Sequence, residues 1–203
     1  MSVSFSTREV RDLGAAWLAL GLAFTLFLYR PAALAVVTAP APGTIAGFAG
    51  AMARSLLTVG VGFLLHELAH KVVAVRFGQV AAFRADYGML GLAIAAGLAG
   101  FLFAAPGAVY HRGSITEREN GLIALAGPVT NVGLAVAFLP LSFLPGFVGA
   151  IGNLGVIVNV LLAGFNMIPF GPLDGRKVLR WNEVVFAIVF VPSVAVAAWI
   201  FLL

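Results

Sequence analysis

Long apolar stretches dominate this chain and alternate with short polar connections. A helix of about 20 apolar residues spans the hydrocarbon core of a bilayer, and each apolar run approaches or exceeds that length. The pattern predicts an all-α polytopic membrane protein with about five or six transmembrane helices. The runs occupy residues 13–29, 46–75, 88–110, 121–144, 147–168 and 184–203.

The run at 88–110 is the one for which the pattern leaves two interpretations open. If the N-terminus with Arg8 is cytoplasmic and this run enters and leaves by the same face, Arg112 and Arg176 return to the cytoplasmic side, as the positive-inside rule requires. A full crossing would place those basic connections outside. We therefore expect a membrane-embedded hairpin or re-entrant segment after the 46–75 helix, with the N-terminus and the chemical site toward the cytoplasm.

The composition supports a membrane protein and narrows its partners. Hydrophobic residues make up 62% of the 203 residues, mean hydropathy is +1.07 and 10% of residues are charged, against about 25% in soluble domains. The net charge of +4 is spread beside the apolar runs, so we expect the lipid bilayer as a partner and no nucleic acid. Residues 1–203 read as one multi-pass membrane domain, compatible with a prokaryotic plasma membrane, and the oligomeric state stays open.

The stretch His66-Glu67-Leu68-Ala69-His70 places ionisable side chains inside an apolar run. Residues four apart on a helix lie about 40° apart around its axis and roughly 6 Å along it, so both imidazoles can reach one metal ion. In such an H-E-x-x-H arrangement two histidines hold Zn²⁺ and the glutamate handles the proton of a water molecule. Ionisable groups are costly at membrane depth, and an interhelical hydrogen-bond cluster is the structural alternative.

A catalytic zinc site has three protein ligands and one open position, so a third ligand must come from elsewhere in the chain. The sequence contains no cysteine, and the donor must therefore be nitrogen or oxygen. His111 lies in a charged connection, where a lone histidine is more typical of a solvated side chain. Asp174 is the better candidate, because Pro169 and Pro172 end the preceding helix and let a carboxylate turn back into the protein.

Three separated motifs within residues 66–175 give the chain a resemblance to a known family. They are His66-Glu67-Leu68-Ala69-His70, Gly127-Pro128-Val129-Thr130-Asn131, and Phe165-Asn166-Met167-Ile168-Pro169 leading to Leu173-Asp174-Gly175. With these motifs the chain resembles the site-2 protease family of intramembrane zinc metalloproteases, in a minimal prokaryotic form without a PDZ insertion. The resemblance implies one Zn²⁺ per chain on His66, His70 and Asp174, with Glu67 as the catalytic base, in a peptidase domain whose core covers about 46–182.

The resemblance also implies a reaction, which is hydrolysis of a peptide bond in or near a transmembrane segment of a membrane protein. It matches Asn166 to an asparagine near the scissile bond, whose amide could stabilise an oxyanion, and a helix-end hydrogen bond is the alternative role. Part of residues 78–110 would pair with an unwound substrate by strand addition. We interpret Asn131 as a packing and hydrogen-bonding residue. The competing functions are a transporter or metal-ion permease that uses the same ionisable cluster, and a non-proteolytic adaptor.

Overall fold

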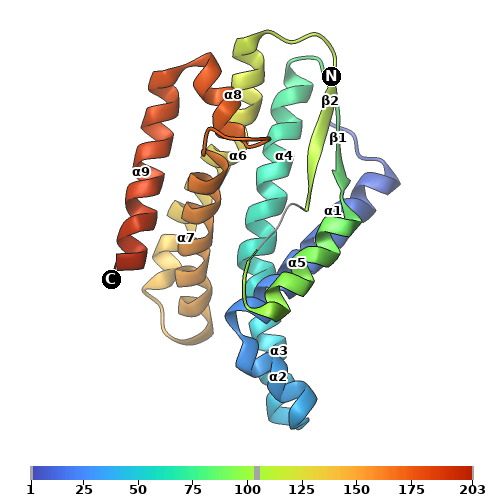
Figure 1. Cartoon of the computed structure of the whole chain (residues 1–203), viewed down its shortest axis with the longest axis vertical. Helices are drawn as coiled ribbons and strands as arrows, with labels where there is room; N and C mark the ends of the chain where they lie inside the picture. The colour runs from blue at the N-terminus through green and yellow to red at the C-terminus, as the bar shows by residue number, and fades with distance from the viewer. Residues whose placement is uncertain (1, 103–105, 203) are drawn as a thin grey trace. The chain divides into compact units, whose positions relative to one another are not determined.

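The computed structural model describes residues 2–102 and 106–202, and most of them are helical (Figure 1). The expected all-α polytopic fold is confirmed. Its elements in chain order are α1 (Thr7–Leu28), α2 (Arg30–Thr38), α3 (Pro42–Ser55), the π-helical turn η1 (Leu56–Gly60), α4 (Val61–Arg76), β1 (Val80–Ala85), α5 (Tyr87–Ala99), β2 (Gly107–Arg112), α6 (Glu117–Ser142), α7 (Gly146–Asn166), α8 (Asp174–Trp181) and α9 (Glu183–Leu202).

Among the described residues, four helical segments are long and apolar enough to cross a membrane. They are α1, the 35-residue segment Pro42–Arg76 that contains α3, η1 and α4, and the helices α6 and α7. Each coincides with one predicted apolar run. The helices α5 and α9 are apolar as well, but they are shorter over the residues described. Four of the six predicted runs are therefore present as helices of spanning length, and the run at 88–110 is divided between a helix and a strand.

The described residues form two compact units, and the first contains most of the chemistry-bearing side chains. It comprises Met1–Phe5, Gly62–Phe83 and Val109–Leu203. Within it α6 packs against α7 and α8, and α9 packs against α7 and α8 (Figure 1). Ala124, Met167 and Val178 form a buried apolar core where α6, the end of α7 and α8 meet. That core anchors α8 beside α6.

The second unit comprises Ser6–Val61 and Arg84–Ala108. Here α1 packs against α5, η1 and α3. Gly97 of α5 permits a close approach to α1, because a Cβ at this position would collide with the backbone carbonyl of Ala23. The Leu56 carbonyl oxygen in the π-helical turn accepts a 3.0 Å hydrogen bond from the Trp17 indole, in addition to the hydrogen bond from the Val61 N–H. The indole contact ties α1 to this turn.

The segment between β1 and β2 has its two ends, Asp86 and Pro106, next to each other. Asp86 caps α5 by accepting a 3.0 Å hydrogen bond from the Met89 N–H, and its own N–H donates to the Pro106 oxygen at 3.1 Å. The strands β1 and β2 flank these two residues and form a two-stranded sheet. A segment whose ends are hydrogen bonded to each other makes no net crossing. The 13 residues of α5 also rise only about 20 Å, short of the roughly 30 Å hydrocarbon core.

Candidate metal centre

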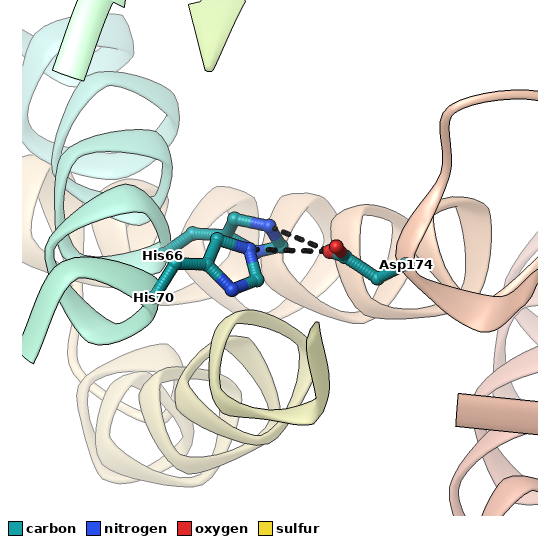
Figure 2. A group of neighbouring side chains, drawn as sticks. All are labelled: His66, His70 and Asp174. Carbon is teal, nitrogen blue, oxygen red and sulfur yellow. Dashed lines mark ion pairs between the residues drawn. The ribbon is translucent and has the colours of Figure 1, made fainter. Parts of the chain in front are cut away.

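Three buried side chains from two distant parts of the chain converge in the first unit. His66 and His70 lie one turn apart on α4, and Asp174 lies in the first turn of α8. Asp174 Oδ2 is 3.3 Å from His66 Nε2 and 3.2 Å from His70 Nε2. Figure 2 shows both imidazoles and the carboxylate pointing toward one another. The exposed fractions are 4% for His66 and 8% for each of the other two residues, so all three residues are buried.

The geometry of these donors fits a zinc ion. Two ligands at about 2.0–2.1 Å from a tetrahedral Zn²⁺ lie roughly 3.3 Å apart. Both Nε2–Oδ2 separations agree with that edge, and the three ligand atoms all lie within 4.8 Å of one another. Two imidazole nitrogens and one carboxylate oxygen are also a donor set that zinc prefers. The fit leaves a fourth position for a reacting molecule.

The Nδ1 atom of each imidazole is hydrogen bonded to a group on α6. His66 Nδ1 lies 2.5 Å from Asn131 Oδ1, and His70 Nδ1 lies 2.7 Å from the Ile123 carbonyl oxygen. With both Nδ1 atoms facing acceptors, both Nε2 atoms are left to face Asp174. Ring orientation is therefore set before any metal binds.

Gly127 lets α6 approach the two imidazoles. A Cβ added there would lie 2.5 Å from His66 Cε1, His66 Nε2 and His70 Nε2. Ordinary contacts between carbon and other heavy atoms are about 3.5–4.0 Å, so no side chain fits without displacing the rings. The glycine of the Gly127-Pro128 motif thus has a steric role at the centre itself.

Asp174 reaches the site because the chain reverses after α7. The helix ends at Asn166, in the region where Pro169 and Pro172 prevent its continuation. Gly175 packs so closely on the backbone of Met167 that a Cβ would collide with the Met167 carbonyl. Asp174 thereby reaches both imidazoles, and a carboxylate binds a metal ion in its deprotonated form.

Glu67 lies on α4 between the two histidines and is 8% exposed. Its Oε2 accepts a 3.1 Å hydrogen bond from the Val109 N–H of β2. The contact ties the carboxylate to a strand and leaves its other oxygen available. In a two-stranded sheet, backbone groups point alternately toward the partner strand and away from it. The N–H that reaches Glu67 therefore marks the edge of β2 that faces α4.

Among the described residues, His111 does not belong to the cluster of His66, His70 and Asp174. His111 is half-buried on β2, and burial, Lys177 and His70 together lower its pKa. Asn166 is the last residue of α7, and its amide donates a 2.9 Å hydrogen bond to the Leu162 carbonyl. That contact is the helix-end alternative considered for Asn166. Its role beside a scissile bond stays a prediction.

Three groups at the centre escaped sequence reasoning or received a smaller role. Asn131 was interpreted as a packing and hydrogen-bonding residue, and the structure places its oxygen on a histidine. The Ile123 carbonyl and the Val109 N–H belong to the backbone, which carries no residue-type signal. Asn131 had such a signal, since a polar side chain within an apolar run calls for a buried partner.

Comparison with known proteins places the chain among zinc metalloproteases. It is 50% identical over 145 residues to "Putative zinc metalloprotease MJ0611" of Methanocaldococcus jannaschii, and the match covers 69% of this chain and 76% of that protein. The chain belongs to the site-2 protease family of zinc metalloproteases. Two further relatives are similar to this chain at 31% identity. They are "Putative zinc metalloprotease YwhC" of Bacillus subtilis, with 62% of this chain and 67% of the relative covered, and "Putative zinc metalloprotease Rip3" of Mycobacterium tuberculosis, with 68% and 34% covered.

The site-2 protease chain therefore spans about a third of the length of Rip3 and two thirds or more of the other two relatives. No protein-family model matches it. No solved structure matches it significantly.

Proposed function

We propose that this chain is an intramembrane zinc endopeptidase that hydrolyses a peptide bond in or near a transmembrane segment of a membrane protein. The observation that supports the proposal most is the buried meeting of His66, His70 and Asp174 beside Glu67, on a helix apolar enough to cross a bilayer. A purely structural zinc site has four protein ligands and no need of a neighbouring base. Three donors with a carboxylate next to them fit a hydrolytic site.

The position of the cluster along its helix supports catalysis at membrane depth. His70 and His66 precede Arg76, the last residue of α4, by six and ten residues, which is about 9 and 15 Å along the axis. If Arg76 lies at the cytoplasmic surface, as the positive-inside rule favours, the cluster lies within the cytoplasmic half of the hydrocarbon core. A cluster of ionisable groups at such depth is costly and marks a functional site.

Each residue has a defined task in the proposed reaction. His66, His70 and Asp174 would hold one Zn²⁺ per chain. When bound, the ion would supply Lewis acidity that polarises a peptide carbonyl and makes a water molecule more acidic. Glu67 accepts the proton of that water through the carboxylate oxygen not committed to Val109, and delivers it to the leaving amine nitrogen. Hydrolysis then needs no covalent intermediate on the protein.

The sheet offers a binding mode for an unwound substrate. A transmembrane helix has all its backbone groups hydrogen bonded, and it must open locally before a peptide bond can be attacked. An extended peptide that pairs with the edge of β2 facing α4 would lie beside Glu67, because the Val109 N–H already reaches that carboxylate. Backbone pairing of this kind reads shape more than sequence, so we expect helix-destabilising residues near the cleavage point of substrates.

The test is a comparison of Glu67→Gln with the wild type in liposomes that contain a fluorogenic transmembrane peptide. We expect Glu67→Gln to retain zinc and to lose at least about 100-fold in cleavage rate, since a positioned base contributes roughly 10²–10⁴-fold. Glu117→Gln at the exposed start of α6 is the matched control and should cleave normally. Cleavage by Glu67→Gln at the wild-type rate would refute the assigned role.

The same liposomes separate the competing functions. A transporter or permease would show zinc flux that changes with Glu67→Gln, and no peptide product in either protein. An adaptor would bind a membrane peptide without cleaving it. We expect zinc-dependent product and no flux from the wild type.

A further inference from the structure

Two buried asparagines form a chain of hydrogen bonds that begins at His66 Nδ1. Asn131 on α6 and Asn159 on α7 are each 0% exposed. Buried amides are costly unless their donors and acceptors are hydrogen bonded. Their partners can be counted, and the count fixes how each amide is oriented.

Both donors of Asn131 are used away from the histidine. Its Nδ2 donates to the Gly62 carbonyl at 3.2 Å and to Asn159 Oδ1 at 2.9 Å. Asn159 in turn donates from its own Nδ2 to the Gly155 carbonyl at 2.9 Å. A flipped Asn131 amide would place its oxygen against two other oxygens and lose both bonds. The orientation with Oδ1 toward His66 is therefore the one that satisfies every group.

The protonation of His66 follows from this orientation. Asn131 Oδ1 is an acceptor only, and it lies 2.5 Å from His66 Nδ1. The hydrogen bond requires a proton on Nδ1, which leaves Nε2, 3.3 Å from Asp174 Oδ2, as the ring nitrogen available to a metal ion. A ring with the opposite tautomer would break this bond and present an N–H where a metal ligand is needed.

We propose that Asn131, held in place by Asn159, is a positioning residue that fixes the tautomer and ring plane of His66 for metal binding. The proposal rests on the zinc site of the proposed function. His70 has the equivalent hydrogen bond from its Nδ1 to the backbone oxygen of Ile123, so no side chain is needed to orient this ring. Gly62 completes the arrangement, because a Cβ there would lie 2.7 Å from Asn159 Oδ1. The pair thus couples α4, α6 and α7 at the metal centre.

The first measurement is nitrogen NMR of labelled imidazoles in the zinc-loaded protein, which distinguishes the ring nitrogen of His66 that binds the metal from the one that carries a proton. The chain has three histidines, so the spectrum is simple. We expect the wild type to carry its proton on Nδ1 of His66, and Asn131→Leu to give a mixture of tautomers. A merely structural role for Asn131 would leave the tautomer unchanged. Protonation of His66 at Nε2 in the wild type would overturn the proposal, even if Asn131→Leu fails to fold.

The second measurement is zinc affinity by competition with a chelator. Removal of such a supporting hydrogen bond costs roughly 10- to 100-fold in metal affinity, and we expect that loss in Asn131→Leu. Asn153→Leu is the control, because Asn153 lies on α7, the helix of Asn159, and its amide donates to a helix carbonyl, that of Gly149, at 3.1 Å. It should bind zinc like the wild type. Equal zinc affinity in Asn131→Leu and Asn153→Leu would overturn the proposal.

A conservative variant separates positioning from stability. Asn131→Asp keeps an oxygen toward His66 and loses both donated bonds, so it should retain the Nδ1 proton and most of the zinc affinity while unfolding at a lower temperature. If Asn131→Asp loses the tautomer as fully as Asn131→Leu does, the acceptor is not what matters and the proposal fails. None of these readouts requires proteolysis, so a wild type that binds zinc and cleaves nothing would refute the proposed function alone.

Discussion

Replacement of Gly127 by alanine tests the metal centre with a single methyl group. The new Cβ would lie 2.5 Å from His66 Nε2 and from His70 Nε2, about 1 Å inside ordinary contact distance for both rings. Overpacking of this kind costs about 1–3 kcal/mol. If this cost displaces the two imidazoles from the positions that bind zinc, zinc affinity drops roughly 5- to 150-fold, since about 1.4 kcal/mol is a factor of ten.

The assay compares Gly127→Ala with Gly133→Ala, which lies on the same helix with nothing within 4 Å of its Cβ. Both changes gain about 1 kcal/mol of helix propensity, so the control isolates the steric effect. Zinc dissociation constants, zinc-free unfolding temperatures and peptide cleavage are measured for both. We expect Gly133→Ala to match the wild type in zinc affinity and Gly127→Ala to lose zinc and activity together. Wild-type zinc affinity in Gly127→Ala would refute the close approach of α6 to the imidazoles.

Three further outcomes are expected. A chelator should lower the unfolding temperature of the wild type, because zinc at 100 times its dissociation constant adds about 2.7 kcal/mol to stability; no shift would argue against a resident metal. Gly107→Ala should abolish cleavage but not zinc binding, since φ is 134° and a Cβ at this first residue of β2 would collide with the Arg84 carbonyl of β1 and disturb the sheet. Gly91→Ala on α5 is the control; its Cβ would meet nothing within 4 Å, and we expect cleavage at the wild-type rate. Burial, Lys177 and His70 lower the pKa of His111, so protonation of this side chain favours the unfolded state. As the pH falls through the ordinary histidine pKa of about 6.5, the wild type should therefore lose more stability than His111→Gln, as measured by thermal unfolding.

The membrane architecture could be predicted because it depends on length and composition. Runs of about 20 apolar residues must become helices in lipid, since their backbone groups find no other partners. The charge argument for the run at 88–110 also led to a segment without net crossing, and the hydrogen bond from Asp86 to Pro106 shows how its two ends meet. Its division into a helix and a strand was not predicted, because both are apolar and periodicity does not separate them.

The candidate site was predictable where residue type carries the chemistry. His66 and His70 had helical spacing, and Asp174 followed two prolines that end a helix, so their meeting required only that two segments approach. The supporting contacts were not predictable, because they depend on how α4, α6 and α7 cross. Asn159 on α7 belongs to none of the three motifs, and its partner on α6 is 28 residues away.

The central claim is that His66, His70 and Asp174 together hold a zinc ion, and the zinc content of purified protein tests it most directly. Metal analysis of the wild type beside Asp174→Ala should give one zinc per chain in the wild type and far less in the variant. Circular dichroism should show that both remain helical, because Asp174 is one of many buried contacts of α8. Equal zinc content in the two proteins would contradict the account.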